Sequence, residues 1–403
     1  MTYSPDAATT RRPPPTRRRW NLRSIWHDAA FRGFVAQALV IITVLGVGVY
    51  MVENAQSAME KRGITTGFAF LFEEAGFSIG DSLISFSSTD TFLRAYGVAI
   101  LNTLKVSAIS LVIATLVGVL LGIMRLSKNV LIAKFSSAYV ELFRNTPQLL
   151  QIVFWYMLVI QLPHPKQALA LFDVAFLSNR GLLIAWPTGN PVHLIMALAF
   201  LVGCIGTWQL VKWADRKRRQ TGKVVHVIWW NISLILSLPI ISWVIGGMPT
   251  DMDIPKFQGF NFRGGVGLTP EFLALFLGLS LYIAAFIAEI VRSGIQSVSK
   301  GQIEAATSVG LGPVDIFRKV IYPQALRVMV PPATAQYVSL IKNSSLGVAI
   351  GYPELFNVNN IILTASGNTI EAIGIMMVVY LTIAFSIAIL MNIYNKSVQI
   401  QER

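Results

Sequence analysis

The stretch EAATSVGLGPVDIFRKV, residues 304–320, lies between two long apolar runs, yet it reads like a piece of a soluble protein. Gly310 offers a left-handed stop to a short helix that begins near Gly301. Pro313 suits the first turn of a second short helix, which Pro323 is expected to end. The stretch therefore predicts a helix-turn-helix projection between two membrane segments.

The second piece of this projection is predicted to be amphipathic, with Val314, Phe317 and Ile321 on one face. This pattern is compatible with two roles. The projection could rest on lipid as an interfacial helix, or it could dock into a partner protein. The piece around Glu304 is poor in large apolar residues and would anchor weakly to lipid, so docking is the better interpretation.

The composition indicates a membrane protein, because 54% of the 403 residues are hydrophobic and only 13% are charged. An ordinary soluble domain has about 25% charged residues. Apolar runs that approach the ~20 residues needed to cross a bilayer occur repeatedly. About eight spans are predicted: 34–52, 98–123, 142–161, 193–211, 224–246, 271–292, 331–350 and 373–395. The seventh is the weakest, because Lys342 interrupts it and Pro331–Pro332 opens it.

The distribution of basic residues predicts that both termini are cytoplasmic, because short cytoplasmic loops retain Lys and Arg. This orientation places the arginine-rich head, the run 216–219 and the stretch 304–320 on the cytoplasmic side. It also accounts for the net charge of +13 without a nucleic-acid partner.

The sequence carries no motif of an enzyme or of a metal site. It has no phosphate-binding G-x-x-x-x-G-K-[ST], no H-E-x-x-H and no G-x-S-x-G, so we expect another chain to supply any ATP hydrolysis. Cys204 is the single cysteine and the four histidines lack metal-type spacing, so no cofactor is expected in this chain. Gly118 and Gly122 favour a close contact between two helices.

Four longer motifs give the sequence a family resemblance. GQIEAATSVGLGPVDIFRKVIYPQA (301–325) resembles the EAA loop of permease subunits of bacterial ABC importers, in which this element seats in a groove of the ATPase subunit. The motifs ELFRNTPQLLQIVFWY (141–156), LSLYIAAFIAEIVRSGIQSVSKGQIEAA (279–306) and KNSSLGVAIGYPEL (342–355) narrow it to the polar-amino-acid permeases of the histidine and glutamine type.

The resemblance implies an all-α integral membrane protein with a type I ABC importer (MetI-like) permease core. An extra N-terminal span and a long insertion are similar to the Q subunits of general L-amino-acid importers. The implied organisation is a basic, disordered cytoplasmic tail at 1–32, an extra span and periplasmic segment at 33–97, a permease domain at 98–395 with its insertion at 162–270, and a cytoplasmic tail at 396–403.

The resemblance also implies partners and a location in the bacterial inner membrane. The expected partners are a homologous second permease subunit, an ATPase dimer that uses ATP and Mg, a periplasmic amino-acid-binding protein and membrane lipid. The residues expected to couple the chain to the ATPase are Gly301, Glu304, Ala305, Ala306 and Gly310.

Candidate residues for the substrate path surround Lys342, which lies about nine residues into the seventh predicted span and thus near mid-bilayer. A zwitterionic amino acid needs a cation or amide donors for its carboxylate and oxygen acceptors for its ammonium. The residues that could supply them are Asn145, Gln148, Lys342, Asn343, Ser344 and Ser345. Alternatively, Lys342 could neutralise Glu289 in a structural pair or bond to freed backbone carbonyls. Glu141, Arg144 and Glu289 are interpreted as a possible gate or brace.

An ion-coupled secondary amino-acid transporter is the alternative function. Such a protein would also be basic and many-spanned, and Lys105 and Lys342 could belong to its coupling site. No inverted repeat and no run of intramembrane carboxylates in the sequence supports this alternative.

Overall fold

The structure is a computed structural model that describes residues 29–61, 67–221, 227–259 and 261–398. The chain divides into two compact units between Gly67 and Phe68. In the first unit the described residues form α2 (Ala29–Glu60), whose apolar part is long enough to cross a membrane. The predicted tail at 1–32 lies almost entirely outside the described residues.

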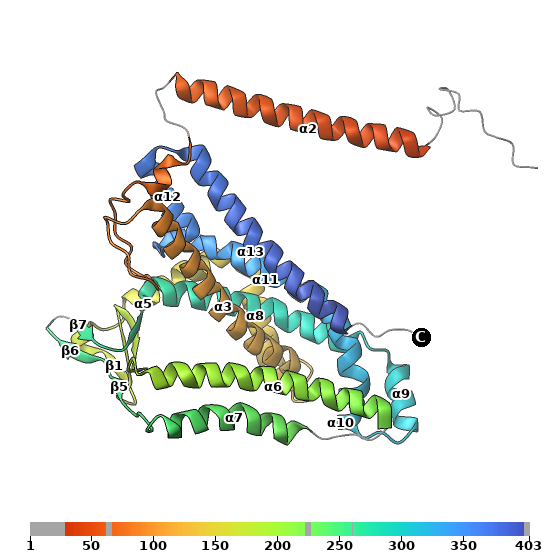
Figure 1. Ribbon diagram of the computed structural model, residues 1–403. Helices are drawn as coiled ribbons and strands as arrows, with labels where there is room; N and C mark the ends of the chain where they lie inside the picture. Colours follow the sequence, from red (N-terminus) through yellow and green to blue (C-terminus); the bar gives the residue numbers. More distant parts are fainter. Residues whose placement is uncertain (1–28, 62–66, 222–226, 260, 399–403) are drawn as a thin grey trace, which may run out of the picture. The chain divides into compact units, whose positions relative to one another are not determined.

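The second unit is dominated by helices (Figure 1). They are α3 (Phe92–Met124), α4 (Val130–Asn145), α5 (Gln148–Ile160), α6 (Pro191–Thr221), α7 (Ile228–Ile245), α8 (Pro270–Gln296), α9 (Lys300–Ser308), α10 (Pro313–Ile316), α11 (Tyr322–Asn343), α12 (Leu355–Ser366) and α13 (Thr369–Val398). Within the described residues, α2, α3, α6, α8 and α13 are long and apolar enough to span a membrane, and α5 and α7 contribute shorter apolar helices. The all-α membrane class predicted from the sequence is confirmed.

The third predicted span, 142–161, is wrong as a single helix. The structure ends α4 at Asn145 and begins α5 at Gln148. Thr146 between them is extended, with φ −107° and ψ 139°. The cause is Pro147, because the residue before a proline is displaced from the helical region by the proline ring.

Pro323 does not end the second piece of the opening stretch, contrary to the prediction. α10 runs into a π-helical turn, Phe317–Ile321, and then directly into α11. In a regular α-helix the ring of Pro323 would clash with the carbonyl four residues earlier, and the wider turn just before it relieves that clash. The second piece of the projection and α11 therefore form one continuous helical segment.

The centre of the second unit is the contact between α3 and α8. A Cβ atom added to Gly118 would lie 2.6 Å from Cβ of Ile287, and one added to Gly122 would lie 2.7 Å from Cβ of Val291. The two glycines thus let the helix backbones approach, as the sequence predicted. The core around this contact contains Ala114, Ile283, Ile287, Val291 and Leu340.

The segment that precedes α3 in the second unit folds onto the start of that helix. Lys105 pairs with Asp81 of this segment at 3.0 Å, and both side chains are largely buried. The ammonium of Lys105 also lies 4.7 Å from the ring centroid of Phe272. Asn102 donates hydrogen bonds to the carbonyls of Asp81 and Pro353. Lys105 therefore has a structural partner inside the chain.

The insertion at 162–270 contains short strands as well as α6 and α7, and none of these strands was predicted from the sequence. A four-stranded antiparallel sheet has the order β1 (Leu169–Leu171), β2 (Ala175–Ser178), β3 (Gly181–Ile184) and β8 (Val266–Leu268). Two smaller pairs join β4 (Trp186–Pro187) with β5 (Met252–Asp253), and β6 (Lys256–Gln258) with β7 (Asn261–Arg263). The strands gather at the ends of α6 and α7 (Figure 1).

Candidate coupling element and polar path

The candidate coupling element consists of α9, the turn at Gly310 and α10. Gly310 has a φ of +78°, the left-handed conformation that the sequence predicted. Its N–H donates to the carbonyl of Thr307, and the N–H of Leu311 donates to that of Ala306. Pro313 occupies the first turn of α10. The glycine thereby closes α9 and reverses the chain within a few residues.

The outer face of the coupling element is small and apolar at its tip. Val309 and Val314 are 76% and 79% exposed on either side of Gly310. The sequence predicted Val314, Phe317 and Ile321 on one face. Val314 and Phe317 are both exposed, and the buried residue of α10 is Ile316.

Four of the five predicted coupling residues are exposed, namely Gly301, Glu304, Ala305 and Gly310. Ala306 is only 6% exposed and packs inside the chain. A partner can therefore contact the first four directly, whereas Ala306 supports the element from within.

The polar path contains a direct contact between α5 and the end of α11. Nδ2 of Asn343 donates a 2.6 Å hydrogen bond to Oε1 of Gln148. Gln148 is 8% exposed, and its Nε2 has no hydrogen-bond partner among the described residues. These two residues, 195 positions apart, therefore lie together as expected, while their role in transport stays a prediction.

The other predicted path residues are arranged differently. Ser344 and Ser345 donate to the carbonyls of Ile341 and Lys342, so both hydroxyls cap the end of α11. Asn145 is exposed at the end of α4 and lies outside this contact. Lys342 is exposed in the last turn of α11, not nine residues into a helix, because Pro331 and Pro332 lie inside α11 and do not open it.

Two of the three residues predicted as a gate or brace, Glu141 and Arg144, lie on the exposed side of α4. The guanidinium of Arg144 is 5.2 Å from the ring centroid of Phe286 on α8. The neighbouring Tyr139 donates a 2.9 Å hydrogen bond to the carbonyl of Leu281, also on α8. These contacts hold α4 against α8.

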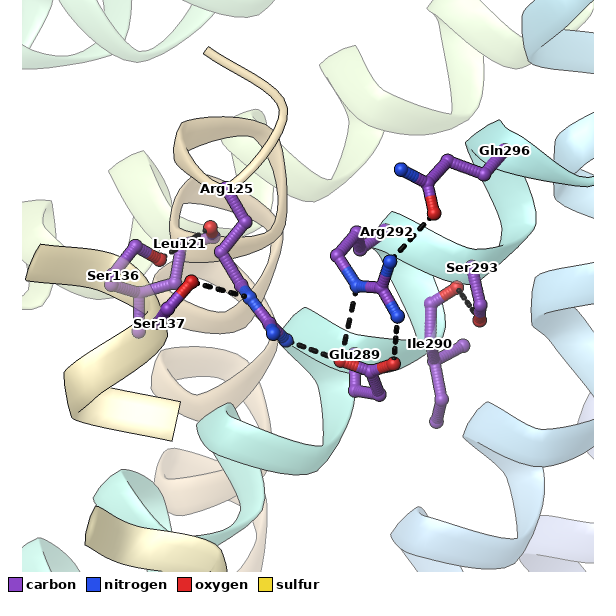
Figure 2. Close-up of polar contacts among 9 residues, drawn as sticks. All are labelled: Leu121, Arg125, Ser136, Ser137, Glu289, Ile290, Arg292, Ser293 and Gln296. Carbon is purple, nitrogen blue, oxygen red and sulfur yellow. Dashed lines mark hydrogen bonds and ion pairs between the residues drawn. The ribbon is translucent and has the colours of Figure 1, made fainter. Parts of the chain in front are cut away.

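Glu289 joins three helices, and Lys342 is not its partner (Figure 2). Its carboxylate accepts from Arg125 at the end of α3 and from Arg292 one turn along α8. Arg125 also donates to Ser137 of α4, and Arg292 donates to Gln296. The alternative pairing of Lys342 with Glu289 is thus wrong in this structure, because two guanidinium groups already hold both carboxylate oxygens.

Residues 114–400 match the family described as the binding-protein-dependent transport system inner membrane component. The chain belongs to this family. It is similar to the general L-amino acid transport system permease AapQ of Rhizobium johnstonii, at 42% identity over 95% of this chain and 96% of the relative. It is also similar to the putative amino-acid ABC transporter permease YhdX of Escherichia coli, at 44% identity over 92% of this chain and 95% of the relative.

A third similar protein is the permease BztB of Rhodobacter capsulatus, named for glutamate, glutamine, aspartate and asparagine. It is 35% identical over 96% of this chain and 99% of its own length. Among solved structures, a chain of an amino acid ABC transporter with histidines covers 76% of this chain and 95% of its own length, with 19% identity and a TM-score of 0.45.

Three polar residues of this inner membrane component were not predicted from the sequence as site residues, namely Arg125, Ser137 and Gln151. Nε2 of Gln151 donates to Thr146 Oγ1 at 2.6 Å and to the carbonyl of Phe143, so it closes the α4–α5 turn. Arg125 could be interpreted only as one member of a basic cluster, since its carboxylate partner lies 164 positions away. Of the three, only Gln151 could have been identified from the sequence, because it is a polar residue within the apolar part of the motif at 141–156.

Replacing Glu289 with glutamine is expected to destabilise this inner membrane component. Arg125 and Arg292 would lose their shared countercharge in a partly buried site, which costs about 1–3 kcal/mol. Thermal unfolding of the purified protein in detergent measures the loss. Asp315→Asn is the matched control, because its ion pair with Lys319 is exposed and contributes little. Equal melting temperatures for the two variants would contradict a stabilising role for the network.

Proposed function

We propose that the chain is the permease subunit of an ATP-driven amino-acid importer and that it forms the translocation path with a homologous second permease. The support is that three relatives named as amino-acid permeases each align over more than nine-tenths of this chain. In this assembly the chain has no catalytic role of its own, and a partner ATPase binds and hydrolyses MgATP.

The single observation that carries ATPase coupling is the exposed coupling element. Its tip offers Ala305, Val309, Gly310 and Val314 without bulky side chains, so another protein can approach the backbone closely. Glu304 beside them forms no ion pair among the described residues, so its carboxylate is open to a partner's basic or N–H group. These features fit a small knob that seats in a groove of the ATPase.

The second permease subunit would cover apolar helix faces that this chain leaves open. The most apolar stretch of α13 contains no buried residue, although its mean hydropathy of 2.5 is high enough for a membrane span. Lipid and a homologous subunit can share this face. A periplasmic binding protein would deliver the amino acid, in keeping with the family's description as binding-protein-dependent.

The proposed orientation places both termini and the coupling element in the cytoplasm. The basic run at 216–219 then lies on the same side as the coupling element, as the retention of Lys and Arg in cytoplasmic loops requires. The strands of the insertion lie on the periplasmic side, since α6 crosses the membrane between them and the basic run.

The proposed substrate path runs past Gln148, Lys342 and Asn343. Two donors could bind a substrate carboxylate. One is Nε2 of Gln148, which has no hydrogen-bond partner among the described residues, and the other is the exposed ammonium of Lys342. Lys342→Gln is expected to reduce amino-acid affinity by about tenfold or more, because a charged hydrogen bond contributes ~1.5–3 kcal/mol. Uptake against substrate concentration measures this, with Lys396→Gln in α13 as the control.

A Lys342→Gln complex that is stable and has unchanged affinity and rate would remove Lys342 from the path. A complex that fails to assemble would assign it a structural role.

Reconstitution tests the function as a whole. The chain, its second permease and its ATPase should be placed in vesicles with the binding protein outside and ATP inside. Amino-acid uptake that requires ATP and persists without ion gradients is the expected result. Uptake driven by an ion gradient without ATP would overturn the proposal and favour the secondary-transporter alternative.

A further inference from the structure

A hollow of about 640 Å³ lies along the last turns of α6, in the insertion and apart from the coupling element and the polar path. It combines aromatic, basic and small side chains. Its lining residues are Gly206, Trp208, Gln209, Leu210, Lys212, Trp213 and Arg216. None of these residues has a part in the proposed transport function.

The hollow sits where the membrane-spanning part of α6 ends. The apolar span of this helix runs from Pro191 to Ala214, and basic residues follow it. Trp208 and Trp213 are 58% and 49% exposed just before that boundary. Tryptophan is enriched at the membrane–water interface because its ring is apolar and its N–H is polar. The hollow therefore opens at the level of the lipid headgroups.

The neighbouring helix brings two more tryptophans to this level. α7 begins shortly after α6 ends and packs beside it (Figure 1). Trp229 and Trp230 lie in its first turn and are 76% and 70% exposed. The two helices are held close by Gly206, where an added Cβ would lie 2.7 Å from Cδ2 of Leu234. The hollow is thus built on a tightly packed helix pair.

The positive charges of the hollow lie against its aromatic rings. Nζ of Lys212 is 3.5 Å from the ring centroid of Trp208, and Nζ of Lys217 is 4.8 Å from that of Trp213. A ring face attracts the ammonium but does not neutralise it. In the described part of the chain, no carboxylate forms an ion pair with Lys212, Arg216 or Lys217. These cations remain available to an anion.

We propose that this hollow binds the phosphodiester headgroup of an anionic phospholipid. Lys212 and Arg216 would donate to the phosphate oxygens, while Trp208, Leu210 and Trp213 contact the glycerol and the upper acyl chains. A free phosphate shares the charge of the headgroup but has nothing to place against these apolar side chains. Basic pockets beside membrane helices recognise lipid headgroups by this combination of charge and depth.

A second hollow in the chain supplies a matched control. It has a volume of about 420 Å³ and also contains two lysines, Lys128 and Lys134. It differs in that it includes the carboxylate of Glu141 and has no aromatic side chain in its lining. The two linings therefore have the same number of basic residues, whereas the aromatic side chains and the lack of an acidic one are particular to the lining of the hollow on α6.

The test titrates the full-length protein in neutral detergent with dioleoyl phosphatidylglycerol or dioleoyl phosphatidylcholine, and native mass spectrometry counts the bound lipid. The protein should prefer phosphatidylglycerol. Lys212→Gln/Arg216→Gln should reduce that affinity by roughly 30-fold, since each basic residue near a membrane surface contributes about fivefold. Lys128→Gln/Lys134→Gln should leave it within about twofold, because this lining contains Glu141 and has no aromatic side chain to hold the lipid.

Two further measurements separate a lipid site from a loss of structure and from a site for a soluble anion. The charge-preserving variant Lys212→Arg/Arg216→Lys should keep the preference for phosphatidylglycerol if charge, and not a damaged fold, decides the affinity. Equal affinity for the two lipids, or equal losses in the two glutamine pairs, would overturn the site. Displacement of phosphatidylglycerol by inorganic phosphate at millimolar concentration would overturn the lipid assignment, because it would indicate a site for a soluble anion.

Discussion

Gly118→Leu is expected to abolish assembly of the transporter, because it forces apart the two helices at the centre of the second unit. The added Cβ alone would lie 2.6 Å from Ile287 Cβ and 2.9 Å from the carbonyl oxygen of Ala284. A backbone carbonyl cannot move away as a flexible side chain can. Overpacking of a core costs about 1–3 kcal/mol and more where backbone is in the way. Size-exclusion chromatography of the complex and its thermal unfolding measure the effect.

Gly97→Leu is the control for this prediction. Gly97 lies in the same helix, and an added Cβ there meets no atom within 4 Å. A general effect of replacing glycine with leucine, on the flexibility of the helix or on its insertion into the membrane, should be the same in both variants. Normal assembly of Gly118→Leu, or equal damage by the two replacements, would refute a requirement for the close helix contact.

Gly310→Phe is expected to leave the chain inserted and folded but to reduce ATP-driven uptake by tenfold or more. The replacement places a bulky ring at the exposed tip and a side chain at a φ of +78°, which costs a non-glycine residue roughly 1–2 kcal/mol. Since an added Cβ at this position meets no atom within 4 Å, the harm should fall on the ATPase contact. Co-purification of the ATPase and transport per ATP hydrolysed are the measurements.

Two further variants separate shape from backbone conformation at this turn. Gly310→Asn should retain more activity than Gly310→Phe, because asparagine tolerates the left-handed region and is smaller. Gly312→Ala should be nearly neutral, since its φ is −73° and an added Cβ meets nothing within 4 Å. Full transport by Gly310→Phe would remove the coupling role of this element.

The features predicted well from the sequence are those set by local chemistry. The left-handed Gly310, the glycines of α3 and most of the apolar spans follow from residues within a few positions of one another. The predicted spans 142–161 and 331–350 do not coincide with single helices. The contact between Gln148 and Asn343 was also predicted, although these two residues are 195 positions apart in the sequence. It was predictable because polar side chains in apolar helices tend to bond to one another across the helix contact.

The features that sequence reasoning missed depend on distant partners or competing local effects. Glu289 pairs with Arg125 and not with Lys342 because α3 and α8 pack so tightly. A proline normally ends a helix, but the π-helical turn before Pro323 makes room for its ring and the helix continues. The strands of the insertion contain only two to four residues, too few for an alternating pattern to identify them.

The unbroken run from α10 through the π-helical turn into α11 has a mechanical consequence. It extends from Pro313, beside the tip of the coupling element, to Asn343, which contacts Gln148. Some 30 residues of helix correspond to roughly 45 Å along the axis. The run is continuous but not uniform, because the π-helical turn and Pro331–Pro332 are points at which a helix bends. A displacement of the turn at Gly310 would be transmitted through these bends toward the Asn343–Gln148 hydrogen bond, and separation of that pair would release two amide groups at once.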